Sequence, residues 1–248
     1  MKWTVLGFQS PFPGPGGATP GYLLEADGKR ILIDCGSGVL AQLGKYCRPH
    51  ELNEVWLSHL HHDHVADFFV LQYALQTAIR LKERPHGLQV LAPPKPVKIS
   101  HLLSYQKAVD LKWIGQGMVH QIGSLEVGFH RTDHPVPCYA MEIRSGKACI
   151  LYGADAGTDT RWETMAREPD LFVCEGTYLH RDAPAQPIGH HSVREAAKAA
   201  TELGARRLLL THLYPGYPAE ILRREAADHY TGELILAEIG LQIPINPL

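Results

Sequence analysis

Several features that would assign the chain to a special class are missing from its sequence. No stretch of the 248 residues approaches the roughly 18 consecutive apolar residues that a membrane-spanning helix needs. Basic residues show no excess, because 24 Lys and Arg stand against 26 Asp and Glu for a net charge of −2. A strongly basic nucleic-acid-binding surface is therefore not expected. Prolines break the chain directly after the short apolar start at residues 1–8, so we expect no signal peptide. The lack of a long apolar run predicts no membrane partner, and the cysteine usage described next predicts a cytoplasmic location.

Cysteine is scarce, whereas histidine is abundant. The five cysteines form an odd number and contain no C-x-x-C pair, which argues against a disulfide framework and against a zinc ribbon. Those that lie in or beside apolar runs are expected to be packing residues, namely Cys35, Cys138, Cys149 and Cys174. With 15 histidines in the chain, any bound metal should be held by imidazole and carboxylate groups.

Short apolar runs typical of strands dominate the chain, with a few helical patterns between them. Strands are predicted at residues 3–7, 21–26, 30–34, 55–58, 88–91, 125–131, 139–143, 148–152, 171–174, 207–211 and 233–236. Helices are predicted at residues 67–81, 100–109, 192–203 and 219–230, the last two with clear start and stop signals. This order predicts an α/β fold of two layered sheets, in a single domain over residues 1–248.

The most informative segment follows the strand predicted at residues 55–58. It carries His59, His61, Asp63 and His64 within six positions. Alternate residues of an extended chain share a side, so His59 and His61 are expected to point together. Asp63 and His64 lie where the chain turns into the next helix and aim at a neighbouring point. The segment therefore predicts two adjacent metal ions, although Asp63 taken alone could instead cap the helix.

Three more candidate ligands follow apolar strands, in positions where open α/β folds collect their chemistry. They are His134, Asp155 and His212. Taken singly, each also has an ordinary interpretation as a loop residue. Together with the first segment they supply five histidines and two aspartates, which is the nitrogen and oxygen donor set of a two-metal hydrolytic site.

These residues stand in the order of a known family. The H-x-H-x-D-H pattern formed by His59, His61, Asp63 and His64 resembles the signature of the metallo-β-lactamase superfamily. The resemblance extends over the whole chain and is closer to the branch that contains ribonuclease Z and related phosphodiesterases. It implies an αββα sandwich, in which two mixed sheets are flanked by helices, with a dinuclear site at the strand ends.

The resemblance also assigns the metal ligands. It implies that one metal is bound by His59, His61 and His134, that the second is bound by Asp63, His64 and His212, and that Asp155 bridges the two ions. Zinc is the expected metal and manganese the alternative, since imidazole and carboxylate ligands admit both. The expected reaction is hydrolysis by a metal-activated hydroxide, with Asp63 accepting the proton of the nucleophile.

Two further stretches resemble the proton-handling motifs of the ribonuclease Z branch. Its H-E-A-T stretch corresponds to residues 174–177 (C-E-G-T), and its H-S-T stretch to residues 189–192 (G-H-H-S). The resemblance implies that Glu175 orients His190, which would protonate the leaving oxygen. An ungapped count back from the last histidine ligand favours His190 over His191. The alternative is that Glu175 and His190 are ordinary loop residues.

The chain departs from ribonuclease Z in one important respect. Asp155 follows His134 by only 21 positions, which leaves room for a hairpin but not for the long arm with which ribonuclease Z grips tRNA. Together with the lack of a basic excess, this argues against a large structured RNA as substrate. The first expectation is a phosphodiesterase for a small molecule. A tRNA 3′-processing endoribonuclease and a lactone or thioester hydrolase are the alternatives, and relatives that dimerise suggest a homodimer.

Overall fold

The computed structural model describes residues 1–246, which fall into two compact units with one seven-stranded sheet each. The N-terminal unit consists of Lys2–Ile114 and Glu238–Ile243. The C-terminal unit consists of Gly115–Ala237 together with Met1 and the last described residues. Each unit therefore contains one sheet and the candidate ligands that follow its strands.

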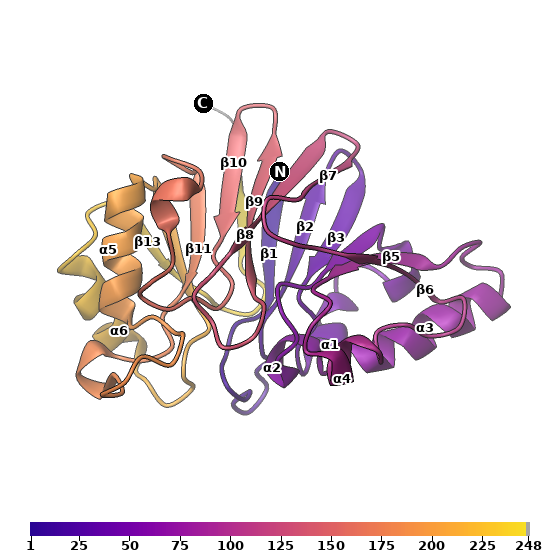
Figure 1. Cartoon of the computed structure of the whole chain (residues 1–248), viewed down its shortest axis with the longest axis horizontal. Helices are drawn as coiled ribbons and strands as arrows, with labels where there is room; N and C mark the ends of the chain where they lie inside the picture. The colour runs from indigo at the N-terminus through magenta and orange to yellow at the C-terminus, as the bar shows by residue number, and fades with distance from the viewer. Residues whose placement is uncertain (247–248) are drawn as a thin grey trace. The chain divides into compact units, whose positions relative to one another are not determined.

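The sheet of the N-terminal unit is mixed. Its strands are β1 (Lys2–Gly7), β2 (Gly21–Ala26), β3 (Lys29–Ile33), β4 (Glu54–Trp56), β5 (Leu88–Ala92), β6 (Val109–Trp113) and β14 (Gln242–Pro244). They lie in the order β14-β1-β2-β3-β4-β5-β6, antiparallel from β1 to β3 and parallel from β3 to β6 (Figure 1). The helical elements of this unit are α1 (Val39–Leu43), η1 (Pro49–Glu51), α2 (His62–Val65), α3 (Phe68–Arg80) and α4 (Val97–Ser100).

Apolar side chains from the strands and from α3 form the core of the N-terminal unit. Leu23 of β2 and Leu32 of β3 face a cluster of fully buried apolar side chains. Helix α3 contributes Phe68, Leu71 and Leu75 to this cluster. Their spacing of three and four residues places them on one face of the helix. The helix predicted at residues 67–81 is thus confirmed, and its apolar face covers the sheet.

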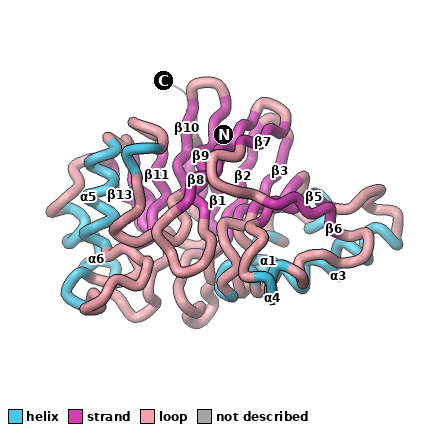
Figure 2. Tube along the Cα trace, viewed as in Figure 1, coloured by secondary structure: helices cyan, strands magenta, loops and turns pink. Residues whose placement is uncertain are grey.

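The sheet of the C-terminal unit is also mixed. Its strands are β7 (Val119–Ile122), β8 (Leu125–Arg131), β9 (Tyr139–Ser145), β10 (Ala148–Tyr152), β11 (Leu171–Glu175), β12 (Arg207–Thr211) and β13 (Glu233–Leu236). They lie in the order β13-β12-β11-β10-β9-β8-β7, antiparallel from β7 to β10 and parallel from β10 to β13. The helical elements are η2 (Trp162–Thr164), η3 (His180–Asp182), α5 (Val193–Leu203) and α6 (Ala219–Ala227), which Figure 2 shows in cyan.

Local signals fix both ends of α5. The Ser192 side chain accepts a hydrogen bond from the backbone N–H of Glu195, and the Glu195 carboxylate accepts one from the Ser192 backbone N–H at 2.7 Å. This is the capping box that the sequence predicts. The helix ends at Gly204, whose φ of 66° lies in the left-handed region that glycine adopts without strain.

The segment between two candidate ligands, His134 and Asp155, forms a plain hairpin. Strands β9 and β10 pair with Ser145 opposite Ala148, so a tight turn connects them. This segment contains no inserted arm, as its length predicts.

The helix predicted at residues 100–109 is wrong. Helix α4 ends at Ser100, and the chain then turns into β6, which pairs in parallel with β5. The side-chain amide of Gln72, on α3, donates hydrogen bonds to the carbonyls of Leu102 and Leu103 at 2.8 and 2.9 Å. These carbonyls are therefore bonded to a distant side chain instead of continuing a helix.

The predicted fold class is confirmed, because both sheets are mixed and helices flank both (Figure 2). None of the helices in the described part of the chain is long and apolar enough to cross a bilayer.

The packing of α3 can be tested at Leu75, whose side chain is fully buried. Leu75→Ala should lower the free energy of unfolding by about 2–5 kcal/mol, because apolar contacts are lost and a cavity is left behind. Urea unfolding followed by circular dichroism would measure this. Val70 lies on the same helix but is 58% exposed, and Val70→Ala should change the stability by less than about 0.5 kcal/mol. Equal losses in the two variants would contradict the observed orientation of α3.

Candidate metal centre

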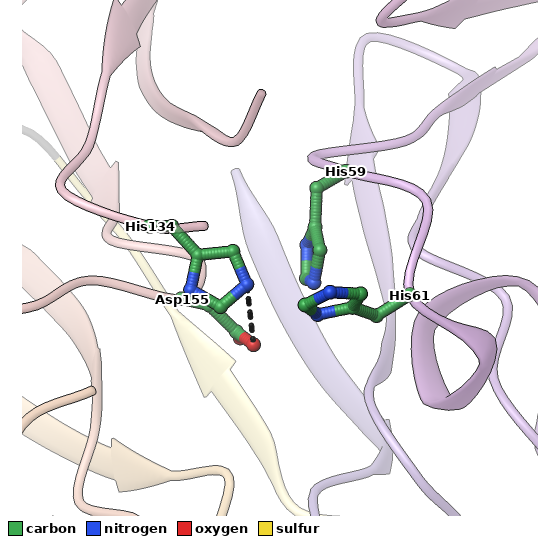
Figure 3. A group of neighbouring side chains, drawn as sticks. All are labelled: His59, His61, His134 and Asp155. Carbon is green, nitrogen blue, oxygen red and sulfur yellow. Dashed lines mark ion pairs between the residues drawn. The ribbon is translucent and has the colours of Figure 1, made fainter. Parts of the chain in front are cut away.

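The histidine-rich segment of the N-terminal unit runs from the end of β4 into α2. His61 is the extended residue that precedes the first turn of α2, and Asp63 and His64 belong to that turn. The rings of His59 and His61 meet almost edge to face, with 4.8 Å between their centroids (Figure 3). The ring of His64 lies 4.1 Å from that of His59. The three candidate imidazole ligands of this unit are thus adjacent.

A buried carboxylate fixes two of these rings. Asp34, which directly follows β3, accepts hydrogen bonds from the backbone N–H and the hydroxyl of Ser58, both at 2.8 Å, and lies 2.9 Å from Nδ1 of His64. The Ser58 hydroxyl oxygen lies 3.1 Å from Nδ1 of His59. Because Ser58 donates its own proton to Asp34, it accepts from His59. Both rings therefore carry a proton on Nδ1, and Nε2 is the atom that can bind a metal.

Asp63 is oriented by the loop that follows β1. The hydroxyl of Ser10 donates a hydrogen bond to Oδ2 of Asp63 at 3.1 Å, and this oxygen lies 3.9 Å from Nε2 of His64. Gly36 packs against the Asp63 backbone so closely that a Cβ at this position would lie 2.0 Å from the Asp63 carbonyl oxygen. The Asp63 side chain is 16% exposed, so a carboxylate held in this place can bind a metal and still reach water.

Asp155 occupies the centre of the candidate ligands in the C-terminal unit. Its carboxylate is almost completely buried, with Oδ2 3.8 Å from Nε2 of His134 and Oδ1 3.3 Å from Nε2 of His212 (Figure 3 shows the first contact). Two ligands bound tetrahedrally to one zinc ion at about 2.0–2.1 Å lie about 3.3–3.4 Å apart. The two oxygens of Asp155 thus face different imidazoles at separations close to those of shared metal ligands, as a bridging carboxylate requires.

Glu175, the last residue of β11, is a second buried carboxylate. Its Oε1 accepts a hydrogen bond from the backbone N–H of Ala156 at 2.6 Å. Both of its oxygens lie 3.1 Å from Nδ1 of His190. Burial raises the pKa of the Glu175 carboxyl, but the positive charge and the hydrogen bond of His190 outweigh burial and hold that pKa below its ordinary value. Glu175 is therefore ionised beside His190.

A hydroxyl connects Glu175 to a candidate metal ligand. The Thr177 hydroxyl donates a short hydrogen bond to Oε2 of Glu175, and its oxygen lies 2.7 Å from Nδ1 of His212. Because the Thr177 proton is directed to Glu175, the oxygen accepts from His212. His212 is thus held with its proton on Nδ1, in the same way that Ser58 holds His59.

The two neighbouring histidines of the 189–192 stretch have different environments. His190 is partly exposed, pairs with Glu175, and has its Nδ1 3.8 Å from Asp155. His191 is buried, and its Nδ1 donates a short hydrogen bond to the carbonyl of Ala156. His190 is therefore the histidine that stands beside both carboxylates.

The roles of three hydroxyl groups at this site are not predicted from the sequence. Ser10, Ser58 and Thr177 each contact a candidate ligand. Of these, only Thr177 lies in a stretch that resembles a family motif, residues 174–177, and a lone serine carries no signal of its own. Asp34 could have been found, since it is an aspartate directly after a buried apolar run. The five cysteines are buried and form no disulfide with one another. Burial raises the pKa of the Cys35 thiol well above its ordinary value, so this thiol remains protonated.

Comparisons with known proteins identify the family of the chain. The family model "Beta-lactamase superfamily domain" matches residues 29–213. "Probable metallo-hydrolase YhfI" of Bacillus subtilis is 34% identical over 246 residues, which cover 97% of this chain and 98% of that protein. The crystal structure of the metallo-beta-lactamase fold protein YhfI has a TM-score of 0.93 over 98% of both chains, at 33% identity. Ribonuclease Z of Streptomyces coelicolor is 26% identical over 294 residues, covering 97% of this chain and 96% of the ribonuclease.

The role of Thr177 can be tested by removing only its hydroxyl. Thr177→Val should lower the zinc affinity of the protein by about 10–100-fold, because the ring of the candidate ligand His212 loses the acceptor that fixes its tautomer. Zinc affinity measured by competition with a chelator would show this loss, and Thr177→Ser should restore the affinity. Thr201→Val is the matched control, since that exposed hydroxyl donates only to the carbonyl of His229. Wild-type zinc affinity in Thr177→Val would contradict the role assigned to the hydroxyl.

Proposed function

Because the chain belongs to the β-lactamase superfamily of metallo-hydrolases, we propose that it is a dinuclear metal-dependent phosphodiesterase that acts on a small phosphodiester. The donor set of the candidate centre supports the metal-dependent part of this proposal. The pair formed by Glu175 and His190 supports the choice of phosphodiesters among possible substrates.

The proposed metals are two divalent ions, with zinc in first place and manganese as the alternative. One ion would be held by His59, His61 and His134, the other by Asp63, His64 and His212, with Asp155 shared. The residues fit this role, because imidazole and carboxylate groups bind both metals and the rings of His64 and His212 are hydrogen-bonded through Nδ1. When bound, such ions lower the pKa of a water molecule and stabilise the negative charge that develops on the phosphoryl oxygens.

The chain's own groups would then handle two protons. Asp63, oriented by Ser10, would accept the proton of the attacking water. His190 directs Nδ1 at Glu175, so its Nε2 is the nitrogen that can reach a substrate, and the side chain is 17% exposed. The ionised Glu175 stabilises the protonated ring, which donates its Nε2 proton to the leaving oxygen. An alkoxide leaving group needs this proton. The Glu175–His190 pair, which can supply it, is the observation that carries the phosphodiester assignment.

A small substrate is supported by what the chain lacks relative to ribonuclease Z. The alignment with the Streptomyces coelicolor enzyme spans 294 positions, more than the 248 residues of this chain, so that enzyme has segments without a counterpart here. Between His134 and Asp155 this chain has only the β9–β10 hairpin. With a net charge of −2, the chain also lacks the excess of basic residues that binds the phosphates of a folded RNA.

The similarity to ribonuclease Z over nearly the whole chain supports a second candidate, a tRNA 3′-processing endoribonuclease. Hydrolysis of a lactone or thioester is the third candidate. A thiolate leaves without a proton, so the Glu175–His190 pair would have no task with a thioester. Side-by-side assays on a small alkyl phosphodiester, a tRNA precursor, a homoserine lactone and a thioester separate the three.

The metal content is the first test of the proposal. Seven ligand side chains exceed what one tetrahedral ion can use, so protein saturated with zinc should contain two ions per chain. Elemental analysis after removal of unbound zinc would measure this number. Asp155→Ala should lower the zinc content, because the shared ligand is lost from both ions, whereas Asp159→Ala, at an exposed loop position, should not. A maximum of one ion per chain would refute the dinuclear centre.

The role of His190 is tested by two leaving groups. His190→Ala should slow hydrolysis of an alkyl phosphodiester by about a hundredfold or more, the usual contribution of a positioned general acid. The loss on a p-nitrophenyl phosphodiester should be much smaller, since p-nitrophenolate departs without a proton. Zinc content should remain at the wild-type value, and His86→Ala, at an exposed position, serves as the control. Equal losses on both substrates would show that His190 positions the substrate or supports the metals instead.

A further inference from the structure

The three residues before the N-cap of α5 contact the candidate centre at successive positions. Ser192 is that N-cap, and residues 189–191, called the 189–191 segment below, come directly before it. The middle residue of the segment is His190, the proposed proton donor. Its outer residues, Gly189 and His191, bond to the chain at two candidate metal ligands. All of these groups belong to the C-terminal unit.

Gly189 orients the ring of His134 through its backbone. Its carbonyl oxygen accepts a hydrogen bond from Nδ1 of His134 at 2.8 Å. Because a carbonyl oxygen can only accept, the ring carries a proton on Nδ1 and presents Nε2 to a metal. The His134 side chain is fully buried, and its Nε2 lies 3.8 Å from Oδ2 of Asp155, the proposed bridging ligand. The carbonyl therefore orients His134 as the Thr177 hydroxyl orients His212.

The backbone geometry at position 189 requires glycine. The φ of Gly189 is 78°, in the left-handed region that other residues rarely adopt. A Cβ atom there would lie 2.6 Å from Cδ of Pro135 and 3.0 Å from Cα of His134. Both distances are shorter than the separation of about 3.5–4.0 Å at which carbon atoms pack. Gly189→Ala would therefore move the carbonyl away from the His134 ring.

His191 holds the chain that follows Asp155. Its buried ring donates a short hydrogen bond from Nδ1 to the carbonyl of Ala156. The backbone N–H of Ala156 donates to Glu175 at 2.6 Å, and the hydroxyl of Thr132 donates to the carbonyl of Asp155 at 2.7 Å. Three side chains thus fix the backbone around the proposed bridging carboxylate, and His191 is one of them.

We propose that Gly189 and His191 are positioning residues of the metal centre, so that the 189–191 segment couples the metal ligands to the proton donor. His190 lies between two residues that are each hydrogen-bonded to the chain at a candidate ligand. Displacing either neighbour therefore lowers the metal affinity, whereas removing the His190 side chain leaves both hydrogen bonds in place. This inference rests on the metal centre proposed above and adds two residues to it.

The role of Gly189 is tested by zinc affinity, measured by competition with a chelator. Gly189→Ala should lower the affinity by about 10–100-fold, the usual effect of losing the hydrogen-bond partner of a metal ligand. Gly117→Ala is the matched control, because Gly117 has a φ of 74° and nothing lies within 4 Å of an added Cβ. Both substitutions strain the backbone in the same way, so a difference in zinc affinity comes from the contact with His134.

The role of His191 is tested by a loss and a rescue. His191→Leu should lower the zinc affinity by about tenfold or more, because the carbonyl of Ala156 loses its donor. His191→Asn should restore most of the affinity, because the Asn side chain can place an N–H donor where Nδ1 of the imidazole lies. Urea unfolding of the metal-free variants separates a general loss of stability from a loss of zinc binding.

Two outcomes would overturn the inference. One is a wild-type zinc affinity in either Gly189→Ala or His191→Leu. The other is an equal loss in His191→Leu and His191→Asn, since the hydrogen bond would then not be the cause. If Gly189→Ala does not fold, the two His191 variants decide the question. Either outcome leaves the metal centre standing, whereas wild-type protein that binds no zinc would refute the centre and this inference together.

Discussion

The candidate site in each unit depends on one fully buried carboxylate. Asp34 and Glu175 have no exposed surface, and a charge in such a place is tolerated only when donors surround it. Each carboxylate holds one imidazole directly, His64 in the first case and His190 in the second. Each also holds a second imidazole through the hydroxyl of a nearby serine or threonine. The two units thus use the same arrangement to orient their histidines.

The two carboxylates and one of the histidines lie at the ends of buried strands. Asp34 directly follows β3, Glu175 ends β11, and His212 directly follows β12. Asp34 and His212 have positive φ angles, 53° and 57°, which side chains other than glycine rarely adopt. A sharp turn immediately after a buried strand lets the side chain stay beside the strand end instead of following the chain into a loop. Such strained positions persist only where the packing around them is strong, and here both parent strands are largely buried.

Much of the fold and of the ligand set can be predicted from sequence, because both depend on local patterns. Buried strands give apolar runs, and the first four candidate ligands lie within one short segment. Strand β6 gives no such run, since most of its residues are partly or fully exposed, and β14 is only three residues long. The helix predicted at residues 100–109 fails because a side chain from α3 bonds its carbonyls. The hydroxyl of Thr177 reaches His212 only because β11 and β12 pair in register, which is a long-range property.

Glu175 connects the proposed proton donor to a candidate metal ligand. One negative charge serves His190 directly and His212 through Thr177, so the carboxylate is shared between a proton donor and a candidate ligand. When His190 gives up its proton in the proposed reaction, the charge on Glu175 is no longer balanced by an imidazolium. The hydrogen bond through Thr177 would then polarise His212 more strongly, which would make its Nε2 a better donor to a bound metal. In the proposed reaction, protonation of the leaving group by His190 and tighter metal coordination by His212 would therefore occur together. A substitution of Glu175 would disturb both the proton donor and the candidate ligand.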